Sequence, residues 1–488
     1  MRKLLALLLV CVFLSGCVGE NQPAAPGKTP AGTPEPAQQD YESRFEEETV
    51  IRLSKGAMDV TGKNSWSVFM SKDIVYYEDR DTYESGRPYG EGEDWERHSM
   101  DEANSHLVIN ITAPGAYRVT GQFPAGQIRV DLGEGAYDDE NAVVELILDN
   151  AEITCTVAPA ILFQNVYECD GAWDKDTAQP NVDTAAAGAN LILRGENRVT
   201  GSHVAKIYKD KKGEKKLWKQ DGAIYSYMSM NVYGPGRLDL TADNEGMDSE
   251  LHLTVNGGDI RIFSDNDGMN ANEEGVSVIT VNGGSLRIAA GLGAEGDGID
   301  SNGYLVINGG TVICAANPVS DAGLDSNLGS FIHGGTVAAL GSPMDWAERE
   351  SGQVTMNLQF TQLRQGAVTV TDEAGNPVFE FDPAADPVLG SCNRGYRGIS
   401  LSCPGFRQGS ACLVYQAGTQ MGYTGTDVGK GPGGKPPAGP PQDGGFREPP
   451  EEGGKIPQGR PGETGQAGTV FYMQDKVNFF SGLEEAEQ

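Results

Sequence analysis

Paired glycines that recur between residues 221 and 340 constrain the fold of this chain more than any other feature. Each pair closes a short stretch of alternating apolar and polar residues, and successive pairs are 26, 26 and 25 residues apart. Alternation with a period of two indicates strands with one buried face, and the glycines indicate tight turns. A repeat of this length without a helical segment predicts one coil of a parallel β-helix per repeat. The pairs are Gly257-Gly258, Gly283-Gly284, Gly309-Gly310 and Gly334-Gly335.

Aligning the repeats places Leu, Val and Ile in inward columns and polar residues in outward columns. In one outward column, Asn256, Asn282 and Asn308 follow one another in successive repeats. Stacked strands lie about 4.8 Å apart, so these amides are predicted to bond up and down the stack. Asp239 beside Arg261 is predicted to be a charge pair between coils. The sequence therefore predicts an all-β solenoid, followed by a small C-terminal all-β cap.

The N-terminus has the features of an export signal. Arg2 and Lys3 precede an apolar run from Leu4 to Leu14, which is too short to span a bilayer as a helix. The run leads into Leu14-Ser15-Gly16-Cys17, which looks like a bacterial lipobox, so Cys17 is predicted to be lipidated and to anchor the protein to the outside of the cell membrane. The alternative is an ordinary signal peptide with a chance cysteine.

Composition divides the chain into six segments. A stretch rich in Pro, Ala, Gln and Glu follows the signal, and a Gly/Pro-rich stretch interrupts the cap. The predicted segments are the signal peptide and lipobox (1–17), a disordered tether (18–48), the β-helix (49–350), the cap (351–427), a disordered insertion (428–467), and a final cap strand with a tail (468–488).

The charge balance limits the possible partners. With 69 acidic and 37 basic residues, the formal net charge is -32. That charge disfavours nucleic acid and anionic membrane surfaces, which are bound through Lys and Arg. It is compatible with cation binding. Cys392, Cys403 and Cys412 lie close enough in sequence for one disulfide, but structural or free thiols are the favoured interpretation of the cysteines.

An acidic-glycine step recurs once per repeat, as in Asn244-Glu245-Gly246-Met247-Asp248. Two carboxylates about 5 Å apart repel by roughly 3 kcal/mol at an effective dielectric near 20. Stacked carboxylates therefore need a cation or protons, and an all-oxygen set suits Ca²⁺. The alternative is that these residues only shape turns. The predicted metal ligands are Asp243, Glu245, Asp248, Asp265, Asp267, Asn270, Asp297, Asp300, Asp321 and Asp325.

A basic island spans residues 204–220 of this acidic chain. It is interpreted as a solvated excursion between coils. The alternative hypothesis is a loop that meets an anionic sugar, with an aromatic ring stacked on the sugar ring. The ligand-binding candidates are Lys206, Tyr208, Trp218 and, just beyond the island, Tyr225.

The chain resembles bacterial surface carbohydrate-binding proteins with a right-handed parallel β-helix of the pectate-lyase type. The resemblance rests on the serial pattern Asp297-Gly298-Ile299-Asp300-Ser301-Asn302-Gly303 followed by Leu305-Val306-Ile307-Asn308-Gly309-Gly310, and on Asp221-Gly222-Ala223-Ile224-Tyr225-Ser226. It implies calcium held by loop carboxylates and binding of plant cell-wall polysaccharide. Two positions depart from the family pattern, Asn270 and Ala322, each in place of an acid. The positions carried over are Asp267, Asn270, Asp297, Asp300 and Asp325.

The predicted function is that of a lipid-anchored, non-catalytic surface protein that binds acidic, polygalacturonate-like or cellulosic polysaccharide through a calcium-containing β-helix. A calcium-dependent pectate lyase is one alternative, with Arg237, Arg261, Arg287 or a loop lysine as the base. A purely structural surface protein is the other. No residue lies in a recognisable catalytic motif, so no catalytic residue is assigned.

Overall fold

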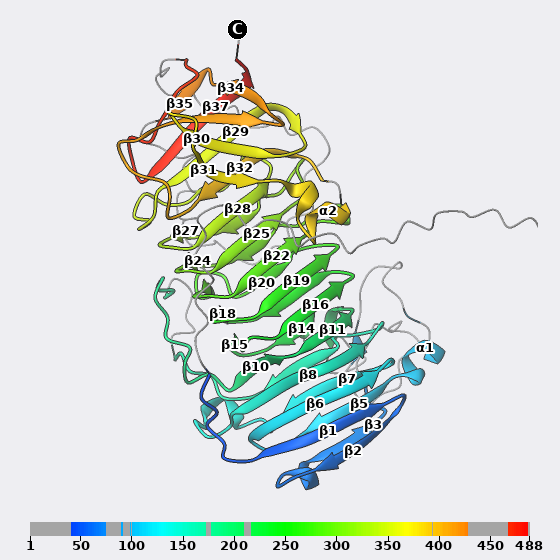
Figure 1. Cartoon of the computed structure of the whole chain (residues 1–488). Helices are drawn as coiled ribbons and strands as arrows, with labels where there is room; N and C mark the ends of the chain where they lie inside the picture. The colour runs from blue at the N-terminus through cyan, green and yellow to red at the C-terminus, as the bar shows by residue number, and fades with distance from the viewer. Residues whose placement is uncertain are drawn as a thin grey trace, which may run out of the picture.

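The computed structural model describes residues 41–74, 89–90, 98, 100–171, 177–208, 216–392, 394–427 and 467–486. Within these residues the protein is all-β, and its strands are stacked from the N-terminal end to the C-terminal end (Figure 1). This confirms the predicted all-β class, whereas the parallel β-helix stays a prediction. The predicted signal peptide with Cys17, the tether up to residue 40 and the insertion from 428 to 466 lie outside the described residues.

The repeats build three ladders of parallel strands, and each repeat contributes one strand to each ladder. Ladder 1 consists of β10 (Ala189–Arg194), β15 (Met230–Tyr233), β18 (Leu253–Val255), β21 (Val278–Val281), β24 (Tyr304–Ile307) and β27 (Gly329–Ile332). Ladder 2 consists of β11 (Glu196–Gly201), β16 (Arg237–Ala242), β19 (Asp259–Ser264), β22 (Ser285–Ala289), β25 (Thr311–Ala315) and β28 (Thr336–Gly341). Ladder 3 consists of β9 (Ile161–Asn165), β14 (Gly222–Ser226), β17 (Glu245–Ser249), β20 (Met269–Ala271), β23 (Ile299–Ser301) and β26 (Leu324–Ser326).

The glycine pairs set the turn between ladder 1 and ladder 2. The second glycine of each pair has a positive φ, between 79° at Gly310 and 102° at Gly258, which glycine adopts without strain. A Cβ on Gly284 would lie 2.8 Å from the backbone carbonyl carbon of Gly257 in the preceding repeat. Both the conformation and the close approach therefore require glycine, and they recur because the repeats stack in register.

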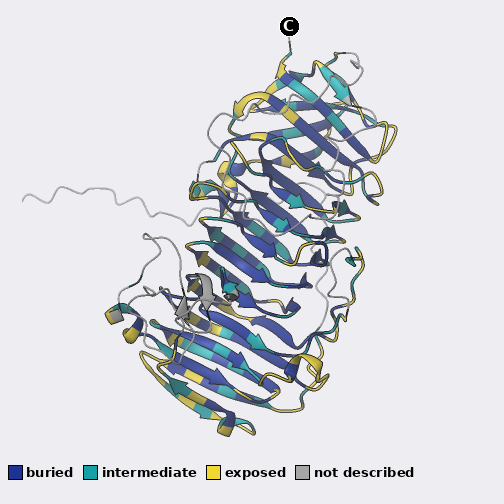
Figure 2. Ribbon diagram, turned by 180° about the vertical axis from the view of Figure 1, so that it is seen from behind, coloured by how far each residue is buried: buried dark blue, intermediate teal, exposed yellow. Residues whose placement is uncertain are grey.

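The inward columns form one continuous core along the stack. Leu253, Ile279 and Leu305 are fully buried and adjacent in ladder 1, and residues of all three ladders join the same cluster. Figure 2 shows buried residues along the strands from end to end. Because the core uses every second residue, the alternate residues form outer faces, where any binding site must lie.

The outer face of ladder 2 corrects one predicted pair. Asp239 and Arg261 are directly opposite in the strand register. The guanidinium of Arg261, however, lies 3.0 Å from a carboxylate oxygen of Asp259, two residues away on its own strand. Arg237 also contacts Asp259, at 2.8 Å, and so one carboxylate serves two arginines.

The strands before the repeats pair in parallel as well, and their description as earlier, less regular coils stays a prediction. They are β5 (Leu107–Ile111), β6 (Gly115–Phe123), β7 (Gly126–Asp131) and β8 (Val144–Thr154), and all four have parallel partners. Before them lie β1 (Glu48–Ser54), β2 (Ala57–Thr61), β3 (Val68–Ser71) and the short helix α1 (Met100–Ser105).

The tether was predicted to extend to residue 48, but its last residues pack on the fold. The Ser43 hydroxyl donates to one carboxylate oxygen of Glu145 at 2.6 Å, and the Arg44 backbone N–H donates to the other at 2.8 Å. Tyr41 packs against Tyr233, with the ring centroids 4.5 Å apart and the ring planes tilted by 42°. The buried carboxylate of Glu145 needs these donors, and this fixes the chain from about residue 41.

The cap begins between β28 and β29, where pairing becomes mostly antiparallel. It has its own core, which includes Phe360, Tyr396 and Phe471. The final strand predicted for the cap is present as β37, which pairs in parallel with β29. The cap strands are β29 (Thr355–Arg364), β30 (Val368–Asp372), β31 (Pro377–Phe381), β32 (Tyr396–Ser402), β33 (Ala411–Gln416), β34 (Thr419–Gly422), β35 (Gly425–Asp427), β36 (Phe471–Tyr472) and β37 (Val477–Glu485), with the helix α2 (Leu389–Cys392) beside them.

The six cysteines of the described residues, including Cys392, Cys403 and Cys412, are free thiols. No helix in the described part of the chain combines the length and the apolar character needed to cross a membrane.

Candidate functional site

Three carboxylates meet at the start of β14 and along β17 in ladder 3. Asp221 directly precedes β14, and Glu245 and Asp248 belong to β17. One carboxylate oxygen from each residue lies within 4.8 Å of the others. Glu245 is 4% exposed and Asp248 is 0% exposed. Buried like charges at this distance require positive charge or protons.

Gly222 makes this approach possible. A Cβ at that position would lie 2.7 Å from the Cβ of Asp248, closer than real side chains pack. The glycine that follows Asp221 therefore leaves the room that the Asp248 side chain occupies.

Three buried oxygen atoms in the cluster have no hydrogen-bond partner among the described residues. They are Glu245 Oε2, Asp248 Oδ2 and Asn270 Oδ1. The other carboxylate oxygens of Glu245 and Asp248 are hydrogen-bonded. Asn270 Nδ2 donates to Glu245 Oε1 at 3.0 Å, and Asn272 Nδ2 donates to Asp248 Oδ1 at 2.7 Å. Leaving buried acceptors unpaired costs roughly 1–3 kcal/mol each. An all-oxygen set of two carboxylates and an amide is the donor chemistry that Ca²⁺ prefers.

Lys219 on β13 (Lys216–Gln220) places a positive charge beside the cluster. Its Nζ lies 2.7 Å from Asp221 Oδ2. Burial disfavours the ammonium, but the carboxylates of Asp221, Glu245 and Asp248 outweigh burial and raise the pKa of Lys219. The ammonium form of Lys219 is therefore favoured beside these carboxylates. One ammonium also balances only one of the three carboxylates.

The pKa values of three carboxyl groups on ladder 3 are raised, chiefly by burial. Burial raises the pKa of Asp248 to about 7. Burial, reinforced by the Asp248 charge, raises the pKa of Glu245 well above its ordinary value. Burial and the neighbouring Asp325 raise the pKa of Asp300 to about 6. A bound cation would favour the charged forms and lower all three pKa values.

The predicted metal ligands fall into three groups in the structure. Glu245, Asp248 and Asn270 belong to the cluster. Asp300 and Asp325 continue the row of Asp248 and Asn270 along ladder 3. Their metal role stays a prediction.

The second group, Asp267 and Asp297, serves the backbone of the next coil. Asp267 Oδ1 accepts the N–H of Asp297 at 2.7 Å, and Asp297 Oδ1 accepts the N–H of Ala322 at 2.5 Å. Burial, together with the charge of Asp267, raises the pKa of Asp297 to about 9. These bonds are the turn-shaping role that was left open as the alternative.

The third group lies away from the cluster. Asp243 accepts from the Ser202 hydroxyl at 2.6 Å, and Asp321 accepts the N–H of Gly296 at 2.8 Å. The pKa of Asp265 is raised by burial and by the charge of Asp243.

The basic island forms strand β12 (Val204–Tyr208) and strand β13, which pair with each other, and β12 also pairs with β4 (Tyr89–Gly90). The side chains of Lys206, Tyr208 and Trp218 lie outside the described residues. Tyr225 is fully buried, and its hydroxyl donates to Glu250. Its ring therefore has no exposed face in this structure, and its ligand-binding role stays a prediction.

Asp221 was missed as a ligand because its repeat is out of step with the others. The register pairs Gly222 with Glu245 and Tyr225 with Asp248, so Asp221 lies one position before the column of Glu245. The Asp-Gly dipeptide itself was the available signal. Lys219 was hidden among the other lysines of the island.

The arginines considered for a lyase lie on another ladder. Arg237, Arg261 and Arg287 belong to β16, β19 and β22 of ladder 2, where Asp259 and Asp386 pair with them. The carboxylate cluster lies on ladder 3. The structure therefore does not bring these arginines together with the carboxylates.

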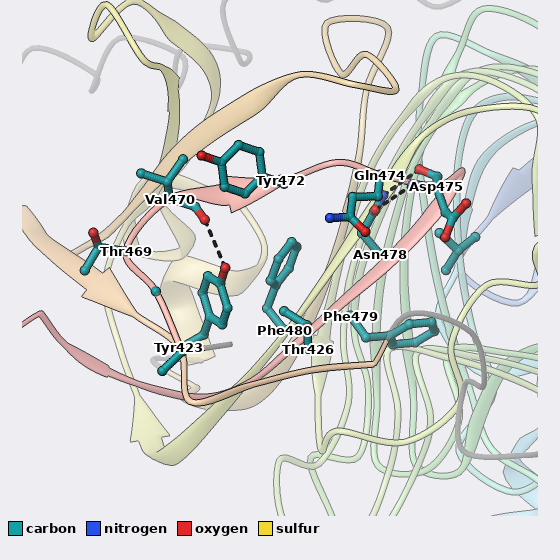
Figure 3. A pocket seen from close by; sticks show the side chains of 13 residues that line it. Tyr423, Thr426, Thr469, Val470, Tyr472, Gln474, Asp475, Asn478, Phe479 and Phe480 are labelled. Atoms are coloured by element: carbon teal, nitrogen blue, oxygen red, sulfur yellow. Dashed lines mark hydrogen bonds between the residues drawn. The ribbon is translucent and has the colours of Figure 1, made fainter. Parts of the chain in front are cut away.

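The cap contains a separate cavity of about 370 Å³ between β36, β37 and the end of β35. In Figure 3 the rings of Tyr423 and Phe480 lie near each other on one side, and Gln474, Asp475 and Asn478 lie together farther along. The Tyr423 hydroxyl donates to the Val470 carbonyl at 3.1 Å. Asn478 bonds the backbone of Asp475 and Thr355, so it organises the cap itself.

Comparison with known proteins identifies the class. The profile of the carbohydrate-binding domain-containing protein family matches residues 105–355, which is just over half of the chain and includes all three ladders. The chain belongs to this family. Among solved structures, a polysaccharide lyase-like protein from C. thermocellum, determined as a gadolinium derivative, is 19% identical, with a TM-score of 0.35 over 59% of this chain and 92% of that one. No curated protein sequence gives a significant match.

Proposed function

We propose that this protein is a non-catalytic surface protein that binds acidic polysaccharide through a calcium ion held at the carboxylate cluster of ladder 3. Membership of a carbohydrate-binding family supports the general partner, a polysaccharide. One observation carries the finer proposal: Asp221, Glu245 and Asp248 each place a carboxylate oxygen within 4.8 Å of the others, and three buried oxygens of Glu245, Asp248 and Asn270 have no hydrogen-bond partner among the described residues.

The residues that would hold the ion are Asp221, Glu245, Asp248 and Asn270. Two of their carboxylates and the amide each have an oxygen that is not bonded to another described residue. When bound, Ca²⁺ would supply a positive centre that a uronate carboxylate recognises. Lys219, already charged beside Asp221, would contribute a second positive group on the same side.

The proposed architecture is a right-handed parallel β-helix, supported by three ladders that advance one strand per repeat. The stack then presents the cluster on a rigid face rather than on a loose loop, which favours a preorganised binding site. Lipidation of Cys17 would hold this face outside the cell membrane. Replacing Cys17 with Ala should release the protein from the membrane fraction into the medium, and continued membrane retention would contradict the anchor.

The binding proposal is tested by retention on immobilised polygalacturonate with Ca²⁺ and with excess chelator. We expect retention only with Ca²⁺, and at least a tenfold loss of affinity in Asp248→Asn. The matched control is Asp139→Asn, which removes an exposed carboxylate whose hydrogen bonds are to nearby Asn141. Equal retention of both variants would overturn the proposed site.

The same incubation separates binding from lyase activity. A lyase releases unsaturated uronates that absorb in the near ultraviolet, whereas a binding protein leaves the polymer intact. We expect no such product, because the arginines of ladder 2 are paired with Asp259 and Asp386, away from the carboxylate cluster.

A further inference from the structure

A second hollow lies on the outer face of ladder 1, away from the carboxylate cluster. It is a groove of about 370 Å³ between the sheet and residues 180–185. This segment runs beside β15 and β18, at the left of Figure 1. The groove crosses successive coils, because Asn256, Asn282 and Asn308 all line it.

The segment that forms the outer wall is fixed at both ends. The Ala178 N–H donates to the Gly275 carbonyl at 3.0 Å. At the other end, the Thr184 hydroxyl lies 2.7 Å from Asn231 Oδ1 and 2.8 Å from Thr254 Oγ1, and Asn231 Nδ2 donates to the Thr184 carbonyl at 2.8 Å. The groove is therefore preformed, which reduces the ordering cost of binding.

The floor of the groove repeats the same polar group in successive coils. Asn308 Nδ2 donates to Asn282 Oδ1 at 2.9 Å, and Asn282 Nδ2 donates to Asn256 Oδ1 at 2.8 Å. A carboxamide has two N–H donors and two acceptor lone pairs. Each ladder bond uses one of each, so Asn282 and Asn308 keep hydrogen-bonding capacity, and both are at least partly exposed. Sugar hydroxyls, which donate and accept at once, match this surface.

Aromatic rings lie at the two ends of the column. Tyr233 precedes Asn256 in the register, and its ring is backed by Tyr41. His333 follows Asn308, and its imidazole is stacked with Phe331 at 6.0 Å and 13°. Flat rings held in place by a second ring suit the apolar faces of sugars.

The charge of the groove distinguishes it from the calcium cluster. Of its described lining residues, none is Lys or Arg, and Asp183 contributes a carboxylate. Such a groove repels uronates and accepts uncharged sugars. We propose that it is a second glycan site, which binds a neutral polysaccharide along the stacking direction without a metal ion.

The proposal is tested by calorimetric titration of the protein with cellohexaose and mannohexaose in excess chelator. We expect binding of at least one of them. Asn308→Leu should weaken it about tenfold, because the loss of one or two hydrogen bonds corresponds to that factor. Val182→Trp, which fills the groove from its outer wall, should weaken it as well. Thr241→Leu, at an exposed position on ladder 2, is the control and should not.

The experiments on the groove and on the carboxylate cluster can contradict one proposal without contradicting the other. Absence of binding to both hexasaccharides, binding that requires Ca²⁺, or equal affinity in the wild type and in both folded groove variants would each overturn the groove proposal. None of these results touches the calcium cluster, which is tested on polygalacturonate. A purely structural asparagine column would lower the melting temperature of Asn308→Leu and leave the affinity of the folded protein unchanged.

Discussion

The outer faces of ladder 1 and ladder 3 are built by the same repeat, yet they differ in electrostatics: one carries a row of neutral amides and the other a row rich in carboxyl groups. On ladder 1, Asn256, Asn282 and Asn308 bond to one another, because an amide both donates and accepts. On ladder 3, the row that contains Asp248, Asn270 and Asp300 is dominated by carboxylates, which only accept when charged. Stacking satisfies the first row and leaves the second in need of positive charge or protons. The same repeat thus yields a face whose polar groups satisfy one another or a face with unmatched carboxyl groups, according to one functional group.

Removal of the proposed Ca²⁺ should have the largest effect on stability, and this effect should arise at ladder 3 and not at ladder 1. A ligand present at about 100 times its Kd stabilises the folded protein by about 2.7 kcal/mol. We expect excess chelator to remove this stabilisation and lower the melting temperature, as measured by thermal denaturation with and without Ca²⁺.

The variant Glu245→Gln tests whether the cluster is responsible. It should lose most of the Ca²⁺-dependent shift, and it should be more stable than the wild type in chelator, because the wild type must either bury a carboxylate charge or take up a proton at Glu245. A full Ca²⁺ shift in Glu245→Gln would show that the cation binds elsewhere.

Interruption of the amide column should have the next largest effect. Asn282→Leu removes two ladder bonds and leaves Asn256 Oδ1 and Asn308 Nδ2 without their partner. We expect a loss of about 1–3 kcal/mol in the free energy of unfolding, measured in urea. Asn308→Leu removes one bond at the exposed end of the described column and should cost less. Neither loss should depend on Ca²⁺, and a Ca²⁺-dependent loss would mean that the two faces are not independent.

Ladder 2 offers a third arrangement, in which the protein supplies its own positive charge. Burial opposes the charge of Asp259, but hydrogen bonds from Arg237 and Arg261 prevail and lower its pKa. The stabilisation is present above the unfolded pKa of about 3.9 and is lost as the pH falls through the lower folded value. Asp259→Asn should cost up to about 1 kcal/mol at neutral pH, since such partly exposed pairs are weak.

The pH dependence makes this last prediction specific. Urea denaturation of the wild type and Asp259→Asn should give stabilities that differ at neutral pH and converge in acid. A difference that stays constant down to low pH would assign the effect to packing rather than to charge.

The repeat in the sequence was sufficient to predict the strands of ladders 1 and 2, because burial of every second residue leaves a readable pattern, whereas the short strands of ladder 3 coincide with the acidic-glycine step and were not predicted. Gly284 and Gly310 also indicate the turns in the sequence, because their positive φ is strained for most other residues. The sequence was less informative where a side chain acts outside its own repeat. Asp267 resembles Glu245 in its motif, yet it bonds the backbone of the next coil. Tyr41 and Ser43 were predicted to belong to the disordered tether, but Ser43 hydrogen-bonds the buried carboxylate of Glu145.

The sequence by itself determined the period, the all-β class and the row of Asp248, Asn270, Asp300 and Asp325, because spacing along a regular strand fixes which residues stack. Only the tertiary structure decided that Asp221 and Lys219 join this cluster, since one comes from an irregular repeat and the other from an excursion of the chain. It alone also placed residues 180–185 over the asparagine column. Such contacts depend on where irregular segments pack against the strands. Local sequence patterns do not predict that position.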